Sequence, residues 1–183
     1  MRNLILLVLF VSIKAEATQW PIGSLVTNWQ SINDAQGRFI CDFPAGYAYH
    51  TEADVLFYAA RADSITLEIH HAFEIVPILP LSGNTPSIIS PISQALNAYA
   101  GYLVQITNGQ VVNQTDINTN GKVGREINLT YYDSSNSIVL RRIFMRVYWD
   151  GSKMHVFSLE AETTYDATLT LYKDMLFNSI QFY

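Results

Sequence analysis

The sequence predicts an α+β protein in which helices pack on an antiparallel β-sheet. Three observations support this prediction. Runs of β-branched and aromatic residues with alternating polarity dominate the chain, two segments have helical spacing, and short polar links join consecutive strands. Strands come first, then a helix, then a run of strands and a second helix. This order is typical of an α+β fold, because a parallel sheet would need strands and helices to alternate.

The first part of the chain has the pattern of strands. Residues 37–43 contain β-type residues and stop at Pro44, and residues 54–60 form a second candidate strand. The clearest strand is 64–76, where apolar and polar side chains alternate. Residues 77–91 contain four prolines and are predicted to form a loop between two halves of one domain.

Residues 91–107 have the strongest helical pattern. Ser90 is a good N-cap and Pro91 suits the first helical position, while Asn108-Gly109 offers a left-handed stop. Apolar residues recur at helical spacing and predict one buried stripe: Ile92, Leu96, Tyr99, Leu103 and Ile106.

The remainder of the chain is predicted to be four strands, a helix and a short closing strand. The strands cover residues 111–117, 123–132, 138–149 and 154–161, and the last three form an antiparallel meander with polar links at 133–137 and 150–152. The second helix spans residues 164–178, where Thr163 and Asp166 resemble a capping box. Residues 180–182 form the closing strand.

The first seventeen residues have the pattern of a secretory signal peptide. Arg2 precedes an apolar run, and Ala15-Glu16-Ala17 fits a small-x-small cleavage site. We therefore expect residues 18–183 to form a single exported domain, secreted or periplasmic. The apolar run is shorter than the roughly 20 residues that span a bilayer, so we expect no membrane span after cleavage.

The charge of the chain argues against nucleic acid and anionic lipid as partners. The chain has 11 basic and 16 acidic residues, and losing two basic and one acidic residue with the leader leaves 9 and 15, a formal charge of −6. Cys41 is the only cysteine, so no internal disulfide is available. We expect its thiol to be buried and inert.

Several short motifs resemble those of PsbP-like domains. They are Gly37-Arg38-Phe39 followed by Phe43-Pro44, Gly121 with Gly124-Arg125-Glu126, residues 142–148 with Gly151 and the strand through Phe157, and the closing residues 177–182. The resemblance implies an antiparallel sheet between helices, an α/β/α sandwich. The family includes photosystem accessory proteins, a nuclear import factor that binds a small GTPase, and exported bacterial proteins of unknown function. The matching residues are structural, so no functional site transfers with them.

Sequence motifs for metal or cofactor chemistry are missing. His70 and His71 are adjacent on a predicted strand, so their side chains point to opposite faces and cannot chelate one ion together. We expect His71 to be buried, His70 to be exposed and neither to hold a metal, and we expect no cofactor. No nucleophile elbow or phosphate-binding loop is present, which makes catalysis less favoured than binding.

The most distinctive charged pattern lies in the meander. If Tyr132 pairs with Ile138, Glu126 lies diagonal to Arg142 and Arg146 on one face of the sheet. This register places Glu126 opposite Phe144 and Asn128 opposite Arg142. A three-residue turn at 150–152 would then place Glu160 beside Arg142. The same turn would group Phe157 and Leu159 with the opposite, apolar face of Ile143, Met145, Val147 and Trp149.

Two interpretations of this charged face follow. It is either a cross-strand charge ladder, which the neutralising acids favour, or a recognition surface for an anionic ligand or partner. The candidate binding residues are Arg142, Arg146, Phe144, Tyr148, Glu126 and Glu160. Because this face also bears Ile138, Leu140 and Val156, we expect a helix or the 77–91 loop to cover part of it, with any binding site along the rim of the cover.

The sequence therefore favours an exported, non-enzymatic accessory or binding domain with an unknown protein or small-molecule partner. One alternative is a hydrolase-type enzyme whose site is assembled from residues distant in sequence. Another is a protein–protein interaction subunit of an envelope assembly. A concave pocket with convergent polar groups would favour the enzyme.

Overall fold

The protein is described by a computed structural model that covers residues 28–34, 38–45, 47–52, 55–62, 65–73, 91–133, 136, 138–149 and 153–183. Within residues 48–73 the side-chain description is confined to Ile65. The predicted loop at 77–90 and the leader lie outside the described residues, as does the N-cap assigned to Ser90.

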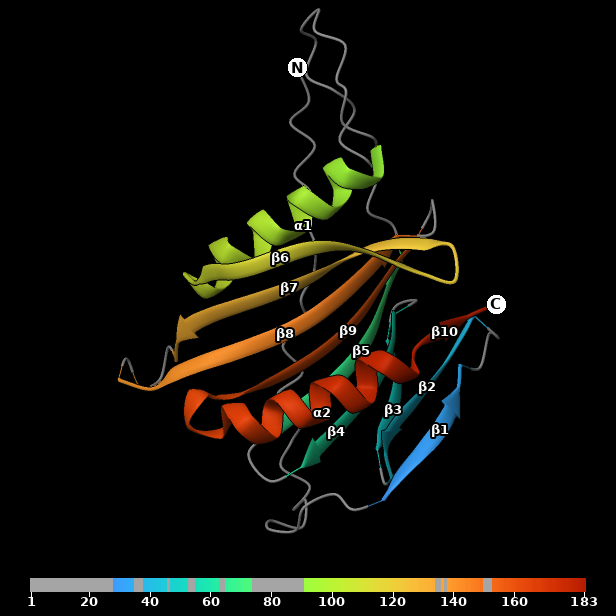
Figure 1. Ribbon diagram of the computed structural model, residues 1–183, viewed down its shortest axis with the longest axis horizontal. Helices are drawn as coiled ribbons and strands as arrows, with labels where there is room; N and C mark the ends of the chain where they lie inside the picture. Colours follow the sequence, from blue (N-terminus) through green and yellow to red (C-terminus); the bar gives the residue numbers. More distant parts are fainter. Residues whose placement is uncertain are drawn as a thin grey trace, which may run out of the picture.

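Two antiparallel sheets and two helices make up the fold (Figure 1). The large sheet has the strand order β3-β4-β5-β9-β8-β7-β6, and the small sheet has the order β1-β2-β10. The strands of the large sheet are β3 (Ala48–Glu52), β4 (Val55–Ala62), β5 (Ile65–Phe73), β6 (Gln110–Thr119), β7 (Lys122–Tyr132), β8 (Leu140–Trp149) and β9 (Lys153–Glu162). Those of the small sheet are β1 (Trp29–Asn33), β2 (Phe39–Pro44) and β10 (Gln181–Phe182), and the helices are α1 (Pro91–Thr107) and α2 (Asp166–Ser179).

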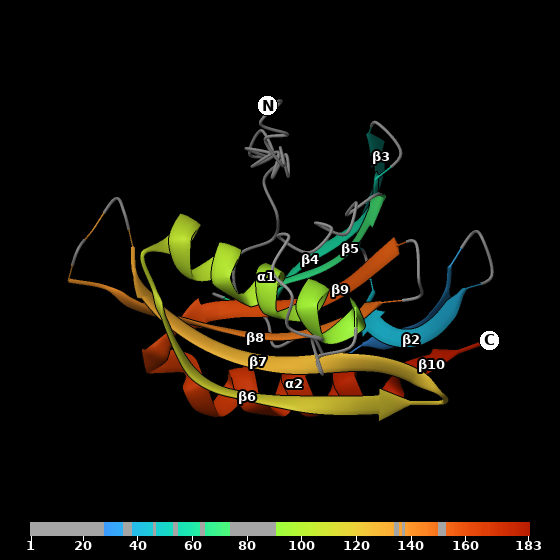
Figure 2. The same cartoon turned by 90° about the horizontal axis from the view of Figure 1, so that it is seen from above.

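The two helices lie on opposite faces of the large sheet (Figure 2), and each covers its own hydrophobic core. Alternate residues of β8 divide between the cores, because successive strand side chains point to opposite faces. Met145 and Val147 pack with α1, whereas Tyr148 packs with α2 and the small sheet. The predicted α+β fold, an antiparallel sheet between helices, is therefore confirmed.

Helix α1 has the bounds that its sequence predicts. Leu96, Tyr99 and Leu103 of the predicted stripe are buried, whereas Ile106 is exposed at the last turn. Asn108 adopts the left-handed conformation with φ 50°, and the Gly109 N–H bonds the Val104 carbonyl at 3.2 Å. The helix ends there because this backbone bond satisfies a terminal carbonyl and leaves the helical path.

The strand β6 runs into β7 through the two-residue turn Asn120-Gly121. Both turn residues have positive φ, 51° and 84°, which is the backbone of a type I′ hairpin. Thr119 and Lys122 close the hairpin as a directly opposed pair. This turn therefore sets the register of the outer hairpin of the large sheet.

The register between β7 and β8 differs from the prediction by two residues. Tyr132 pairs with Leu140, not with Ile138, and the Asp133 N–H bonds the Val139 carbonyl just beyond this pair. A shift of two preserves the faces, so Glu126 stays on the arginine face. It moves directly opposite Arg146, while Asn128 faces Phe144.

The register between β8 and β9 differs by one residue, and here the faces exchange. Trp149 pairs with Met154, so the connection is one residue longer than the predicted turn at 150–152. Phe157 and Leu159 consequently lie on the face of Tyr148 and Phe144, and Val156 joins the opposite core with Val147. The predicted grouping of these β9 residues was wrong, because a one-residue slip turns every side chain over.

Helix α2 begins without the predicted capping box. Thr163–Tyr165 form a 3₁₀ turn, Tyr165 is the N-cap residue, and no side chain caps it. Asp166 occupies the first turn of the helix, where a negative charge is favourable. Its carboxylate bonds Arg142 instead of closing a capping box.

Two strands of the structure, β1 and β3, were not among the predicted elements.

Candidate functional site

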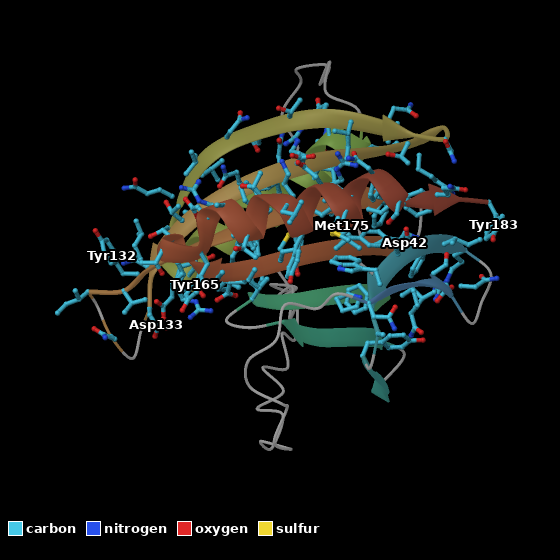
Figure 3. All side chains as sticks on the ribbon, turned by 60° about the horizontal axis from the view of Figure 1, so that its bottom comes forward. Asp42, Tyr132, Asp133, Tyr165, Met175 and Tyr183 are labelled. Atoms are coloured by element: carbon cyan, nitrogen blue, oxygen red, sulfur yellow. The ribbon has the colours of Figure 1, made fainter. Side chains whose placement is uncertain are left out.

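The candidate arginines occupy the face of β8 that α2 covers. Arg142, Phe144, Arg146 and Tyr148 alternate along β8, and Glu126 of β7 lies beside them. Figure 3 shows α2 lying across this face. The expected cover is therefore present, and it is a helix. Ile138, in the turn before β8, remains 87% exposed outside it.

Arg146 connects the sheet to the C-terminal end of α2. Its Nε donates to Glu126 Oε2 at 2.8 Å, and its Nη1 donates to the Phe177 carbonyl oxygen at 2.8 Å. The guanidinium also lies 4.7 Å from the centroid of the Phe177 ring. Carbonyls in the last turn of a helix lack helical partners and carry partial negative charge. Arg146 therefore holds this helix end on the sheet.

Arg142 makes the corresponding connection at the N-terminal end of α2. Its Nε lies 3.0 and 3.1 Å from the two carboxylate oxygens of Asp166, and its Nη1 donates to Asn128 Oδ1 at 3.1 Å. With Arg146 it binds both ends of one helix from two positions on one strand. These ion pairs are partly exposed. Each of the two guanidinium groups therefore already has a carboxylate partner within the protein.

Phe144 lies between these two arginines at the rim of the helix. The Lys173 ammonium is 5.2 Å from its ring centroid and the Arg142 guanidinium is 5.9 Å away. Both distances are within the range of cation–π attraction. Phe144 is partly exposed, so this rim presents one aromatic ring flanked by positive charges.

Tyr148 lies in the core, where no solvent reaches it. The residue is 0% exposed, its ring packs 4.7 Å from that of Phe182, and its hydroxyl is 2.9 Å from Thr119 Oγ1. Burial raises the pKa of the hydroxyl. Gly124 lies opposite Tyr148 in β7, and a Cβ there would be 2.6 Å from the Tyr148 ring. Among the candidate residues, Tyr148 is thus part of the packing around the site.

Glu160 lies on the opposite face, beneath α1. The one-residue shift places it opposite Ile143, and its Oε1 accepts hydrogen bonds from Tyr131 Oη and Arg141 Nε, both at 2.5 Å. Burial, and then the Glu160 charge, raise the pKa of the Tyr131 hydroxyl well above its usual range. The predicted contact between Glu160 and Arg142 was wrong, because it depended on the shorter turn.

Two further arginines have structural roles that the sequence pattern does not reveal. Arg125 is 7% exposed, and it bonds Asp116 of β6 at 2.8 Å and Asn97 of α1. Arg38 bonds Asp34, whose carboxylate is fully buried, at 2.7 Å. Asp34 and Arg38 are four residues apart, so a search for charge pairs at this spacing could find them. They lie between β1 and β2 and not on a helix, where such pairs are usually sought.

Three exposed apolar side chains gather at one end of the sheet. Tyr132 is 60% exposed at the end of β7, Ile138 is 87% exposed in the following turn, and Tyr165 is 39% exposed just before α2. Arg141 pairs with Glu162, so the chain after β9 reaches the same end, and Figure 3 shows Tyr132 and Tyr165 there. We call Tyr132, Ile138 and Tyr165 the hairpin-end patch.

The acidic residues around this patch outnumber the basic ones. Asp133, Glu162 and Asp166 lie at this end, and the nearby arginines are Arg141 and Arg142. Part of this patch has a sequence signal, because the apolar residues Tyr132 and Ile138 flank the polar link 133–137.

The histidine predictions concern His70 and His71, whose side chains lie outside the described residues. Their backbones pair with Val156 and His155, respectively, in β9. Within the described part of the chain, no three His, Cys, Asp or Glu residues are placed to hold a metal ion. Cys41 is buried, as expected, and desolvation followed by the charge of Asp42 raises its pKa far above the usual value.

The Glu126–Arg146 pair yields a stability prediction. Glu126→Ala is expected to lower the free energy of unfolding by about 0–1 kcal/mol, because both side chains are partly solvated and Arg146 keeps its bond to Phe177. Arg146→Ala should cost more, about 1–3 kcal/mol, since it frees the end of α2. Urea melts of both variants measure this order. A loss above about 3 kcal/mol for Glu126→Ala would instead indicate a buried network.

Comparison with known proteins identifies the fold. No family model matches the chain, and no curated protein matches its sequence. Cyanobacterial PsbP (CyanoP) from Synechocystis sp. PCC 6803 has a similar structure, with 13% identity and a TM-score of 0.57 over 90% of this chain and 100% of that one. The chain therefore has a PsbP-like fold.

Two further structures share this fold. The Ran-binding protein Mog1p of Saccharomyces cerevisiae is 9% identical, with a TM-score of 0.53 over 85% of this chain and 95% of that one. LpqN of Mycobacterium tuberculosis, involved in cell envelope biogenesis, is 12% identical, with a TM-score of 0.53 over 84% and 90%. At these identities the likeness establishes the fold. Among the described residues, no helix has the length and apolar character needed to cross a bilayer.

Proposed function

We propose that this chain is an exported, non-enzymatic accessory domain that binds another protein through the hairpin-end patch. The observation that supports this function is the gathering of Tyr132, Ile138 and Tyr165 at one end of the sheet, each more than a third exposed. Aromatic residues are enriched in protein interfaces, and an apolar cluster with a polar rim is typical of them. The ring of Phe144, with Arg142 and Lys173 beside it, lies at the edge of α2, the helix that Tyr165 precedes.

The candidate residues divide between two roles in this proposal. Arg142 and Arg146 hold α2 against the sheet, so they position the surface, and Glu126 orients Arg146. Phe144 is available to a partner at the rim, whereas Tyr148 packs in the core and Glu160 forms an ion pair with Arg141 on the opposite face. One protein with this fold, the Ran-binding protein Mog1p, also binds another protein.

Photo-crosslinking tests the proposed surface. A photoreactive phenylalanine analogue at Ile138 is expected to give one recurrent protein adduct in the native host, because this side chain is 87% exposed and is the most exposed of the patch. The matched control is Leu171, 55% exposed on α2. Tyr132→Ser/Tyr165→Ser should then weaken binding of the purified adduct partner at least about tenfold without lowering Tm. Equal adducts from both positions, or unchanged affinity of the double variant, would refute the proposed surface.

Export is a separate part of the proposal, and it rests on the leader and on the involvement of LpqN in cell envelope biogenesis. The protein purified from outside the cytoplasm is expected to begin at Thr18, because Ala15-Glu16-Ala17 is the cleavage signal. N-terminal sequencing and intact mass measure this. An uncleaved chain that stays in the cytoplasm would contradict export. It would not bear on the binding surface, which the crosslinking experiment tests separately.

A further inference from the structure

The outer edge of the large sheet is the ten-residue strand β6, which pairs with β7 on its inner side (Figure 2). An edge strand exposes unpaired backbone groups, and proteins usually protect such edges with proline, lysine or a bulge. Residues 113–119 contain no proline and no basic residue, and the single bulge lies before them, between Val111 and Asn113. Asp116 is their one charged residue, and Arg125 binds it at 2.8 Å.

The type I′ turn determines which backbone groups point outward. In a two-residue hairpin the closing pair is hydrogen-bonded, so the N–H and C=O groups of Thr119 point toward β7. The pattern alternates along the strand, which directs the backbone groups of Gln114, Asp116 and Asn118 away from the sheet. The side chains of these three residues are exposed, and so is that of Thr115 between them.

We propose that two copies of this chain pair antiparallel through β6, with Thr115 of each copy directly opposite Thr115 of the other. In this register Gln114 faces Asp116 of the second copy, and both residues have outward backbone groups. Each Gln114–Asp116 pair is therefore a hydrogen-bonded pair, and the symmetry supplies it twice. The result is one continuous sheet across two copies.

The side chains select this register over its neighbours. Moving the symmetry centre to Asp116 would set two carboxylates opposite each other, which is unfavourable. Moving it to Gln114 would bring Val112 of the bulge opposite Asp116 and interrupt the ladder. With Thr115 at the centre, Arg125 engages Asp116 Oδ1 and leaves Oδ2 to accept a hydrogen bond from the Gln114 amide of the second copy. A Thr–Thr pair at the centre is also favourable.

Cysteine crosslinking tests the register. Thr115→Cys is expected to form an intermolecular disulfide with oxidised glutathione, since non-hydrogen-bonded partners have Cα atoms about 4.5 Å apart, within disulfide reach. Gln114→Cys is the matched control, because the two Gln114 residues are offset by two positions along the strands and lie beyond about 7 Å. The native Cys41 is buried and should not compete. A crosslink at 114 and none at 115 would overturn the proposed pairing.

Sedimentation analysis tests the association itself. The mass of the purified protein is expected to rise toward twice that of one chain as concentration increases, and Thr115→Lys should return it to one chain, because two lysines would face each other. Gln114→Pro should do the same without breaking the β6–β7 ladder, since the lost N–H points outward. A protein that stays monomeric up to about 1 mM, or a dimer that persists in both variants with native circular dichroism, overturns the proposal.

Discussion

Gly124→Ala is expected to lower the free energy of unfolding by about 3 kcal/mol or more, at the upper end of the cost of overpacking. A Cβ at this position would lie 2.4 Å from the Val147 carbonyl oxygen and 2.6 Å from Tyr148 Cδ1. The first contact is with backbone of the neighbouring strand, so a side-chain rotation cannot relieve it. The substitution must displace β8 from β7, between the outer hairpin and the rest of the large sheet.

Gly101→Ala is the matched control for this prediction. The glycine lies within α1, and a Cβ there meets nothing within 4 Å. Alanine should therefore stabilise the protein by about 0.5–1 kcal/mol, because glycine is a poor helix former. Urea melts of the two variants should shift in opposite directions. Equal and small shifts would mean that β7 and β8 approach less closely at Gly124 than the structure indicates.

The second large effect is expected at the entry to β2. Arg38→Met should cost about 3–5 kcal/mol, since it removes the cation that faces the fully buried carboxylate of Asp34. The Arg38 guanidinium donates to both carboxylate oxygens of Asp34, at 2.7 and 3.2 Å, and methionine can donate to neither. Chemical denaturation of the variant measures the loss.

Two variants separate the buried charge from general damage. Asp34→Leu/Arg38→Met should recover part of the loss, because no unpaired charge remains buried. Lys173→Met should cost less than about 1 kcal/mol, since its partner Asp174 is 56% exposed. If the double variant were less stable than Arg38→Met alone, the buried charge would not be the cause.

Local signals in the sequence were sufficient for most elements of the fold, although not for β1 and β3. Helix α1 has its predicted bounds because its proline start, apolar stripe and Asn108-Gly109 stop all act within a few residues. The PsbP-like motifs likewise indicated the sandwich that the structure confirms. Such signals need no knowledge of what packs against the element.

The candidate site could be predicted only in part. The pattern correctly placed Glu126, Arg142, Arg146 and Phe144 on one face, since period-two alternation is local. It did not reveal the hairpin-end patch, because the patch combines the end of β7 with the start of α2, which are far apart in the sequence. Nor did it indicate that Arg142 and Arg146 bind the two ends of that helix.

Tertiary structure alone decided the strand registers and the roles of the charges. Both faces of β8 and β9 are buried, so their apolar residues do not distinguish one face from the other, and the turn length becomes decisive. The contacts of Arg142 with Asp166 and of Arg146 with Phe177 join residues 24 and 31 positions apart. Whether an arginine faces a ligand or a helix end depends on how that helix docks, and docking is determined by the shape of the core it covers.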